Sequence, residues 1–365
     1  MINFAYITLL FPNKHGICTY IDGAILTGLG LRKQNVTYKL ICMITKDISS
    51  DIIEILKIVY DDVVIVDYIT PINNLGIKIE SGIFSKDDYK DDNNYSEMAK
   101  IFTKLHIFNS ELFPYDKILF IDNDLIPLQK FDELFNINCP AAWLEHSVET
   151  AHNYIKIWNV WENINHGELI DTKFTKIYEI PGRSINAGLM LIKPDKKIFD
   201  DMLQLLKKPV KDWSKTNFEF KGVINDNKQL VNYYKYPEQD FLTQYFYDKW
   251  YMIDGRFCAW GNNVKYNIYG MHMAGLRYIV DGFWKNYKTW ELQIPDDDNF
   301  NIISNKIAIW GFKKYPILKS ILYRDLTFYI NRCIIRINDI SINDNNYNKL
   351  NFYQKKLLEE LFSTS

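Results

Sequence analysis

Short apolar runs and amphipathic stretches alternate over residues 1–70. Three runs rich in aliphatic and aromatic residues predict β-strands: 4–10, 38–45 and 62–69. Between them, apolar residues recur at helical spacing from Tyr20 to Leu29, and the segment 51–60 has one apolar face with a capping-box-like start at Asp51 and Glu54. The strand–helix–strand–helix–strand order requires crossover connections, so we expect an α/β fold with a mostly parallel central sheet flanked by helices.

The pattern continues after a break in the middle of the chain. Residues 71–95 show no period and end in many Lys, Asp and Asn residues, which indicates a long surface loop. Ser96 then caps an amphipathic helix that runs to Phe108, and the fully apolar run 117–121 predicts a strand buried on both faces. The pattern further predicts a strand from 184 to Pro194, a helix over 197–208 and a helix that opens at Pro237.

The composition excludes several classes of protein. The 365-residue chain has a formal net charge of −2, so it lacks the basic surface expected of a nucleic-acid-binding protein. Its five cysteines follow no metal or disulfide spacing, which favours a reducing compartment. Without a secretory signal, and without a run approaching the ~18 apolar residues of a membrane span, we expect a cytoplasmic protein. Heavy use of Asn, Ile, Lys and Tyr indicates an AT-rich genome, such as that of a large DNA virus.

Two carboxylates, Asp122 and Asp124, follow the apolar strand 117–121. Residues two apart on a strand point to the same side, so both project from its carboxyl end, where α/β folds bind ligands. Converging carboxylates favour Mg²⁺ or Mn²⁺, completed by phosphate oxygens of a substrate. A solvated turn is the alternative, because Asp and Asn are common after strands. An EF-hand loop is excluded, because Ile126 stands where an oxygen ligand is required.

Five sequence blocks in one order over residues 4–290 together resemble the glycogenin-like members of glycosyltransferase family 8. The blocks are FAYITLL with TYIDGAILTGLGL, FTKLHIFNSELFPYDKILFIDNDLIPLQKFDELF, SINAGLMLIKPD, PEQDFLTQYF and MHMAG. The second block contains the pair Asp122 and Asp124 as its D-x-D motif. The resemblance implies a GT-A type nucleotide-sugar-binding domain, a UDP-sugar donor, Mn²⁺ with Mg²⁺ as an alternative, and hexose transfer with retention at the anomeric carbon.

The resemblance also implies roles for individual residues. Asp122, Asp124 and His272 would hold the metal ion. The donor would be bound by residues from four of the five blocks: Thr8, Leu9, Tyr20, Lys104, Asn123, Ala187, Gly188 and Gly275. The catalytic residues would be Asp122, Asp124, Asn186, Glu238, Gln239 and Asp240. Glu238 stands where the family usually has Asp. Glu238 or Asp240 would serve either a covalent intermediate or front-face attack, and the sequence leaves both routes open.

Several of these residues also have a purely structural interpretation. His272 can be a hydrogen-bonded structural histidine, and Lys104 can lie on a solvated helix face. The segment 186–188 can be a strand bulge. Asp240 can be a favourable charge at a helix N-terminus.

The chain departs from the family pattern after His272. Tyr278 stands where a diphosphate-binding lysine is expected, and Arg277 or Lys285 would supply that charge instead. No tyrosine matches the self-glucosylated residue of glycogenin, so self-priming is not expected. Residues 145–182 are either an acceptor-binding insertion or a buried aromatic cluster.

We therefore expect a catalytic domain over 1–295, with loop insertions at 71–95 and 145–182, and a helical C-terminal extension over 296–365. The expected reaction moves glucose from UDP-glucose onto a glycan or a glycosylated protein, such as a glycogen-like chain or a collagen-type galactosyl-hydroxylysine. Transfer from UDP-galactose is one alternative, and a catalytically weak UDP-sugar-binding scaffold is another. The family resemblance also leads us to expect a homodimer.

Overall fold

The computed structural model describes the part of the chain from which all structural statements below are drawn. The described residues are 3–12, 20–71, 99–146, 164–172, 183–208, 223–224, 230–231, 237–260, 268–272, 307, 310–311 and 313–318. The predicted loop 71–95 lies almost entirely outside these ranges, as do Gly275, Arg277 and Lys285.

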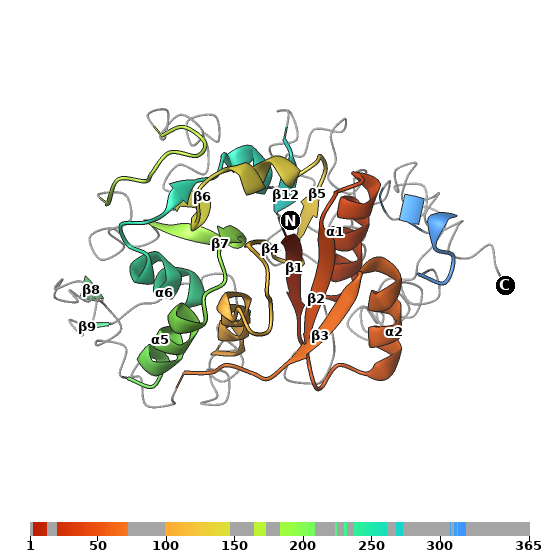
Figure 1. Cartoon of the computed structure of the whole chain (residues 1–365), viewed down its shortest axis with the longest axis horizontal. Coiled ribbons are helices and arrows are strands. Elements are labelled where there is room, and N and C mark those ends of the chain that lie inside the picture. Colours follow the sequence, from red (N-terminus) through yellow and green to blue (C-terminus); the bar gives the residue numbers. More distant parts are fainter. Residues whose placement is uncertain are drawn as a thin grey trace, which may run out of the picture.

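A seven-stranded mixed sheet forms the centre of the molecule (Figure 1). Its strands, in spatial order, are β10 (Tyr251–Met252), β6 (Ala141–His146), β7 (Arg183–Ile192), β4 (Lys117–Ile121), β1 (Phe4–Leu10), β2 (Lys39–Thr45) and β3 (Asp62–Val66). Strands β4, β1, β2 and β3 are parallel neighbours, and β10 is parallel to β6. Only β7 pairs antiparallel with its two neighbours, β4 and β6. The prediction of a mostly parallel sheet is confirmed.

The helices follow from the amphipathic stretches of the sequence. They are α1 (Ile21–Lys33), α2 (Ser50–Val59), α5 (Lys196–Leu206) and α6 (Pro237–Tyr245), with 3₁₀ helices η2 (Lys100–Phe108), η3 (Asp132–Asn136) and η6 (Gly255–Cys258). α1 and α2 lie beside β1–β3, and α5 and α6 lie on the side of β7 (Figure 1). α1, α2 and α6 pack against strands, whereas α5 packs against η2. Burial of an apolar face in this way is the main source of helical stability in a globular protein.

Two local predictions need correction. The capping box at Asp51 and Glu54 is wrong, because α2 begins one residue earlier, with Ser49 at the N-cap position, and Glu54 pairs with Lys57 instead. The helix that ends at Phe108 is present, but it is wound as a 3₁₀ helix, and its expected cap lies outside the described residues. By contrast, Asp195 caps α5 through its carboxylate, which accepts two backbone N–H groups.

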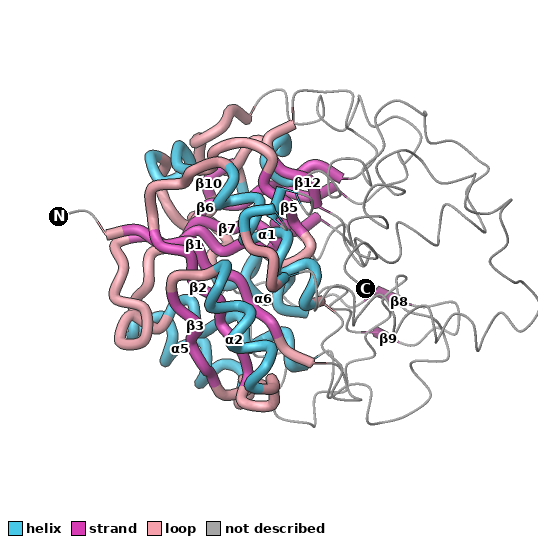
Figure 2. Tube along the Cα trace, turned by 90° about the vertical axis from the view of Figure 1, so that its right-hand side faces the viewer, coloured by secondary structure: helices cyan, strands magenta, loops and turns pink. Residues whose placement is uncertain are grey.

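A small second sheet was not predicted from the sequence. It consists of β11 (Ala259–Trp260), β12 (Gly270–His272) and β5 (Leu125–Pro127), with β5 antiparallel to β12. β5 lies against α1 (Figure 2), where the Thr27 hydroxyl donates a hydrogen bond to the Leu125 carbonyl at 2.9 Å. The pairing of His272 with Leu125 brings two distant segments together directly after the acidic motif. A separate antiparallel pair is formed by β8 (Val223–Ile224) and β9 (Leu230–Val231).

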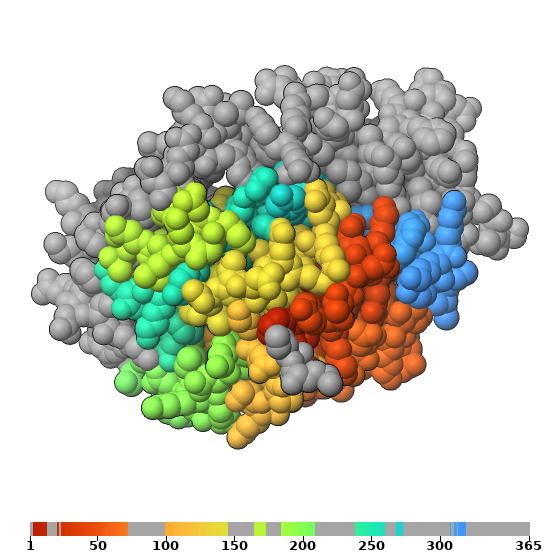
Figure 3. All heavy atoms as spheres, turned by 45° about the horizontal axis from the view of Figure 1, so that its top comes forward, coloured from red at the N-terminus to blue at the C-terminus, as the bar shows by residue number. Residues whose placement is uncertain are grey.

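The described part of residues 307–318 packs beside helices α1 and α2 (Figures 1 and 3). Ile307 and Leu318 are buried in the same core as α1 and α2. A Cβ atom at Gly311 would lie 2.4 Å from the Leu29 side chain, so any larger residue would have to displace that side chain.

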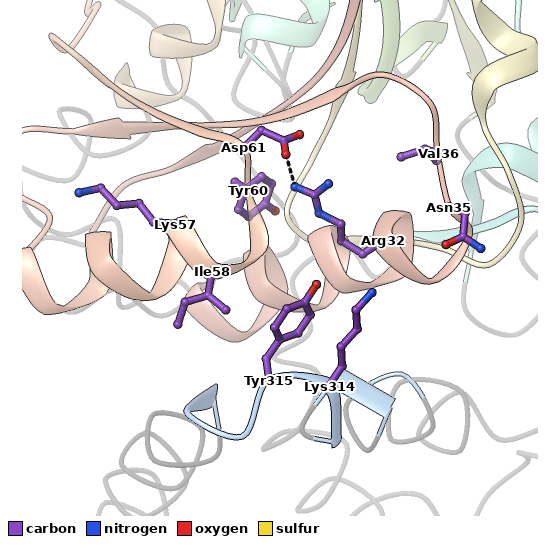
Figure 4. A pocket seen from close by; sticks show the side chains of 9 residues that line it. All are labelled: Arg32, Asn35, Val36, Lys57, Ile58, Tyr60, Asp61, Lys314 and Tyr315. Atoms are coloured by element: carbon purple, nitrogen blue, oxygen red, sulfur yellow. Dashed lines mark hydrogen bonds and ion pairs between the residues drawn. The ribbon is translucent and has the colours of Figure 1, made fainter.

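Lys314 and Tyr315 face the end of α1 across a polar hollow (Figure 4). In this hollow, Arg32 is ion-paired with Asp61 at 2.6 Å, and the Asp61 carboxylate also accepts the backbone N–H of Leu40. Because Leu40 stands near the start of β2, the hollow lies at the amino edge of the parallel strands, opposite to the edge where ligands are expected.

The predicted insertion 145–182 is partly described, and its residues 164–172 continue the sheet region beside β10. The Met252 backbone carbonyl accepts the Gly167 N–H and the Met252 N–H donates to the Glu168 carbonyl, both at 2.8 Å, and the Ile170 N–H donates to the carbonyl of Trp250 at 2.8 Å. The aromatic residues expected within 147–163 lie outside the described residues. In the part of the chain that the structure describes, no helix is both long enough and apolar enough to cross a membrane.

Asp132, at the start of η3, connects β1 to the loops at the amino edge of the sheet through hydrogen bonds. Its carboxylate accepts hydrogen bonds from the buried Tyr6 hydroxyl at 2.5 Å, from the Thr37 hydroxyl at 2.7 Å and from the Thr37 backbone at 3.1 Å, and it contacts Lys130 at 3.1 Å. Partial burial alone would raise the pKa of Asp132. The hydrogen-bond donors outweigh burial and lower the pKa of Asp132 below the usual value.

We predict that Asp132→Asn lowers the free energy of unfolding by about 1–2 kcal/mol at pH 7, because charge-assisted hydrogen bonds are weakened. A lowered folded-state pKa stabilises the protein above the unfolded value of about 3.9, and this contribution is lost as the pH falls through the folded value. The difference between variant and wild type is therefore expected to shrink below about pH 4. Urea unfolding at several pH values measures it.

The control is Glu54→Gln, which removes one partner of the exposed Glu54–Lys57 pair. We expect a change below about 0.5 kcal/mol for this variant. A loss in Asp132→Asn that stays constant down to pH 3 would contradict the proposed role of the charge.

Candidate active site

The acidic motif lies at the carboxyl end of β4, as predicted. Its position is held from both sides: the Asp122 backbone N–H donates to the Gly188 carbonyl at 2.8 Å, and the Leu125 N–H donates to the Asp122 carbonyl at 3.0 Å. Because β7 runs antiparallel to β4, its residues 186–188 meet the carboxyl end of β4. This reversal of one strand brings two of the predicted blocks together.

Asp122, Asp124 and His272 form a cluster that fits a divalent cation. One ligand atom from each lies within 4.8 Å of the others. His272 Nε2 is 3.2 Å from Asp124 Oδ1, and His272 is only 5 % exposed. Two carboxylates and one imidazole form a mixed oxygen and nitrogen ligand set, which suits Mn²⁺ better than Mg²⁺. The donor atoms of these three residues are those that a divalent cation requires.

Electrostatics also favour a cation between these residues. Burial raises the pKa of Asp122 to about 6, and repulsion from the neighbouring Asp124 and Glu238 acts in the same direction, while Lys104 and His272 oppose it. Burial disfavours the charged form of His272, but the contacts with Cys258 and Asp124 outweigh burial and raise its pKa well above the usual value. A cation at the cluster would relieve the repulsion between the carboxylates.

Lys104 is the structural centre of the site. It comes from η2 and is only 1 % exposed. Its ammonium contacts Asp122 Oδ1 at 3.1 Å, Glu238 Oε1 at 3.0 Å and the Ala187 carbonyl at 3.1 Å, and it lies over the Phe120 ring. An ammonium has three protons, and each of them has a protein acceptor here. Burial alone would lower the pKa of Lys104, but the two carboxylates outweigh burial and raise it.

The first turn of α6 is fixed to β7 by one side chain. Gln239 Oε1 accepts the Ala187 backbone N–H at 3.0 Å, and Gln239 Nε2 donates to the Ser184 hydroxyl at 2.8 Å. Glu238 points to Lys104 from the same turn, and Asp240 is also buried. The predicted catalytic residues 238–240 are therefore rigidly placed beside the strand that carries Asn186.

Gly188 packs against His272 and is hydrogen-bonded to Asn186. Asn186 Oδ1 accepts the Gly188 backbone N–H at 2.9 Å. A Cβ atom at position 188 would lie 2.6 Å from His272 Cε1. The glycine allows this close approach of the backbone to the imidazole. The pairing of β7 with β6 shifts register between Met190 and Asn186, as the alternative interpretation of this segment as a strand bulge predicted.

Four of the residues predicted to bind the donor lie on or next to β1 and α1: Thr8, Leu9, Tyr20 and Asn123. Asn123 points away from the acidic pair and donates to the Leu9 carbonyl at 2.9 Å, so it links the motif to the end of β1. Thr8 is buried, and its hydroxyl has no hydrogen-bond partner among the described residues. Tyr20 is the residue before α1.

Sequence reasoning missed one residue that contacts the cluster. Cys258 Sγ lies 3.3 Å from His272 Nδ1 and 3.6 Å from Asn186 Oδ1. A scattered cysteine carries no motif of its own. Cys258 lies 14 residues before His272 in the sequence, and the pairing of β11 with β12 brings the two side chains together.

A ligand site at the carboxyl edge of a mostly parallel sheet, with a metal-binding set of side chains, is the arrangement of an α/β enzyme. The model of the family "Glycosyl transferase family 8" matches residues 18–292. The chain belongs to this family. It is a UDP-sugar-dependent glycosyltransferase with the GT-A fold expected from the sequence.

Known proteins similar to this chain are distant. The uncharacterized protein R707 of Acanthamoeba polyphaga mimivirus is 28 % identical over 290 residues, which cover 80 % of this chain and 83 % of R707. Human glycogenin-2 is 32 % identical over 117 residues, which cover 32 % of this chain and 20 % of glycogenin-2. The galactosyltransferase LgtC, solved with donor and acceptor sugar analogues, aligns with a TM-score of 0.44 and 12 % identity over 80 % of this chain and 98 % of LgtC.

We predict that Lys104→Met destabilises the fold by about 3–5 kcal/mol, because it leaves Asp122 and Glu238 buried without their counter-charge. The double variant Lys104→Met with Glu238→Gln is expected to recover part of this loss, since it removes one of the unpaired carboxylates. Chemical unfolding at pH 7 measures both variants.

Lys39→Met is the matched control, because it breaks the exposed pair of Lys39 with Asp62. We expect a loss below about 1 kcal/mol for it. If Lys104→Met is as stable as the control, Lys104 does not hold the site together.

Proposed function

We propose that this chain transfers glucose from UDP-glucose to a glycan or a glycosylated protein, with retention, in a Mn²⁺-dependent reaction. The observation that carries the proposal is the cluster of Asp122, Asp124 and His272 at the carboxyl edge of the sheet, inside the matched family region. Glucose as the donor sugar follows from the motif resemblance to glucose-using members. The viral relative supports a large DNA virus as a source, and we propose a cytoplasmic enzyme.

In this proposal Asp122, Asp124 and His272 hold the ion. A bound Mn²⁺ would offset the charge of the donor diphosphate and stabilise UDP as the leaving group. The protein contributes a fixed geometry: Lys104 keeps Asp122 ionised and oriented, and the backbone at Gly188 keeps His272 in place. A site assembled before the donor arrives does not have to reorganise during the reaction.

The sugar would lie between the metal cluster and the first turn of α6. Asn186 offers an amide for sugar hydroxyls. Glu238 is ion-paired with Lys104 at 3.0 Å, and Asp240 lies one residue beyond Gln239. Either carboxylate would serve a covalent route, whereas front-face attack needs neither as a nucleophile. Because Lys104 is saturated by protein acceptors, we propose that it organises the carboxylates and does not bind the donor directly.

A UDP-sugar-binding scaffold is the second candidate. The observation in its favour is Tyr278 in the place of the expected lysine, which leaves Arg277 or Lys285 to meet the diphosphate. The complete cluster of Asp122, Asp124 and His272 favours catalysis, because a protein that only binds has less need of a metal ligand set.

The test is UDP release from a panel of UDP-sugars, measured with Mn²⁺ and with EDTA in the absence of acceptor. We expect slow hydrolysis of UDP-glucose that EDTA abolishes. Asp124→Ala is expected to lower this rate at least about a hundredfold while the protein stays folded. Asp67→Ala, at an exposed carboxylate outside the cluster, is the matched control and is expected to retain full activity.

Full activity of Asp124→Ala would contradict the metal site. Preference for UDP-galactose would correct the donor. Tight UDP binding without release, even in the presence of candidate acceptors, would support the scaffold.

A further inference from the structure

Cys258 carries a buried thiol that contacts two residues of the proposed site. It ends η6, directly before β11, and is 0 % exposed. Its sulfur is 3.3 Å from His272 Nδ1 and 3.6 Å from Asn186 Oδ1. It therefore lies behind the imidazole, on the side opposite to Asp124, and joins the histidine to the strand that carries Asn186.

The position of this thiol is fixed by the small second sheet. β11 and β12 are parallel, with Ala259 paired to Met271 and Trp260 paired to His272. Cys258 immediately precedes this paired segment, so it cannot move independently of His272. On the other side, Asn186 is held by its own hydrogen bond from the Gly188 backbone. The three side chains form a chain of contacts from β7 through η6 to β12.

The direction of the hydrogen bonds along this chain decides whether His272 can bind a metal ion. A thiol is both a weak donor and a weak acceptor. If the thiol proton points to Asn186 Oδ1, the sulfur accepts Nδ1–H of the imidazole, and Nε2 keeps its lone pair on the side of Asp124. If the proton points to Nδ1, then Nε2 carries the hydrogen and cannot be a ligand. Asn186 provides the acceptor that makes the first direction available.

We propose that Cys258 is a positioning residue that holds His272 in the tautomer and orientation needed to bind the metal ion through Nε2. The inference rests on the proposed Mn²⁺ site. Metal-bound histidines generally donate their second N–H to a fixed partner, and loss of that partner costs roughly 10–100-fold in metal affinity. Here the partner is a thiol in place of the usual carboxylate or carbonyl.

The test measures Mn²⁺ affinity in the presence of UDP, from the electron paramagnetic resonance signal of free Mn²⁺. We expect Cys258→Ala to weaken the affinity about tenfold or more. Cys258→Ser keeps a donor and an acceptor at the same place, so its affinity is expected to lie between alanine and wild type. Cys42→Ala is the matched control, because Cys42 is equally buried but lies on β2 and contacts Met43 instead of the site.

Each outcome separates the explanations. Unchanged affinity in Cys258→Ala overturns the inference while leaving the metal site intact. An equal loss in Cys42→Ala also overturns it, because the effect would then come from a cavity in the core. If Cys258→Ser binds Mn²⁺ no more tightly than Cys258→Ala, the hydrogen bonds of the thiol do not position His272. If wild-type protein with UDP binds no Mn²⁺, the proposed function fails together with the inference.

Discussion

The ion cluster around Lys104 is the interaction on which the rest of the site depends. One buried ammonium meets the end of β4 through Asp122, the middle of β7 through the Ala187 carbonyl and the start of α6 through Glu238. These elements are far apart in sequence, and the lysine itself comes from η2. A buried charge is costly unless all its partners are in place, so the four elements must assemble together or not at all. The same contacts hold Asp122 beside Asp124 and His272.

Much of the fold could be predicted from local pattern. The runs 4–10, 38–45 and 117–121 became β1, β2 and β4 because apolar residues on both faces fit a strand covered by helices. The acidic pair could be placed because a strand directs alternate side chains to one side. His272 joined the pair only through the family resemblance, since nothing within the chain's periodicity links it to Asp124.

What escaped prediction depends on contacts between distant segments. The antiparallel direction of β7 cannot be read from its own residues, yet it determines that Asn186 and Gly188 face the acidic motif. The three-residue strands β5 and β12 are too short to show a period, and they exist because they pair with each other. Cys258 was overlooked for the same reason. For Lys104, the sequence predicted its place on a helix. It could not predict that three acceptors surround the ammonium, because these acceptors come from distant segments.

The packing of Gly311 against Leu29 has a consequence for how this protein is shortened in the laboratory. A chain cut at residue 295, where the sequence suggests a domain boundary, would lose Ile307 and Leu318 from the core and leave the Leu29 side of α1 facing water. Exposed apolar patches of this kind promote aggregation. A chain that keeps residues up to at least 318 would therefore aggregate less than a chain that ends at residue 295.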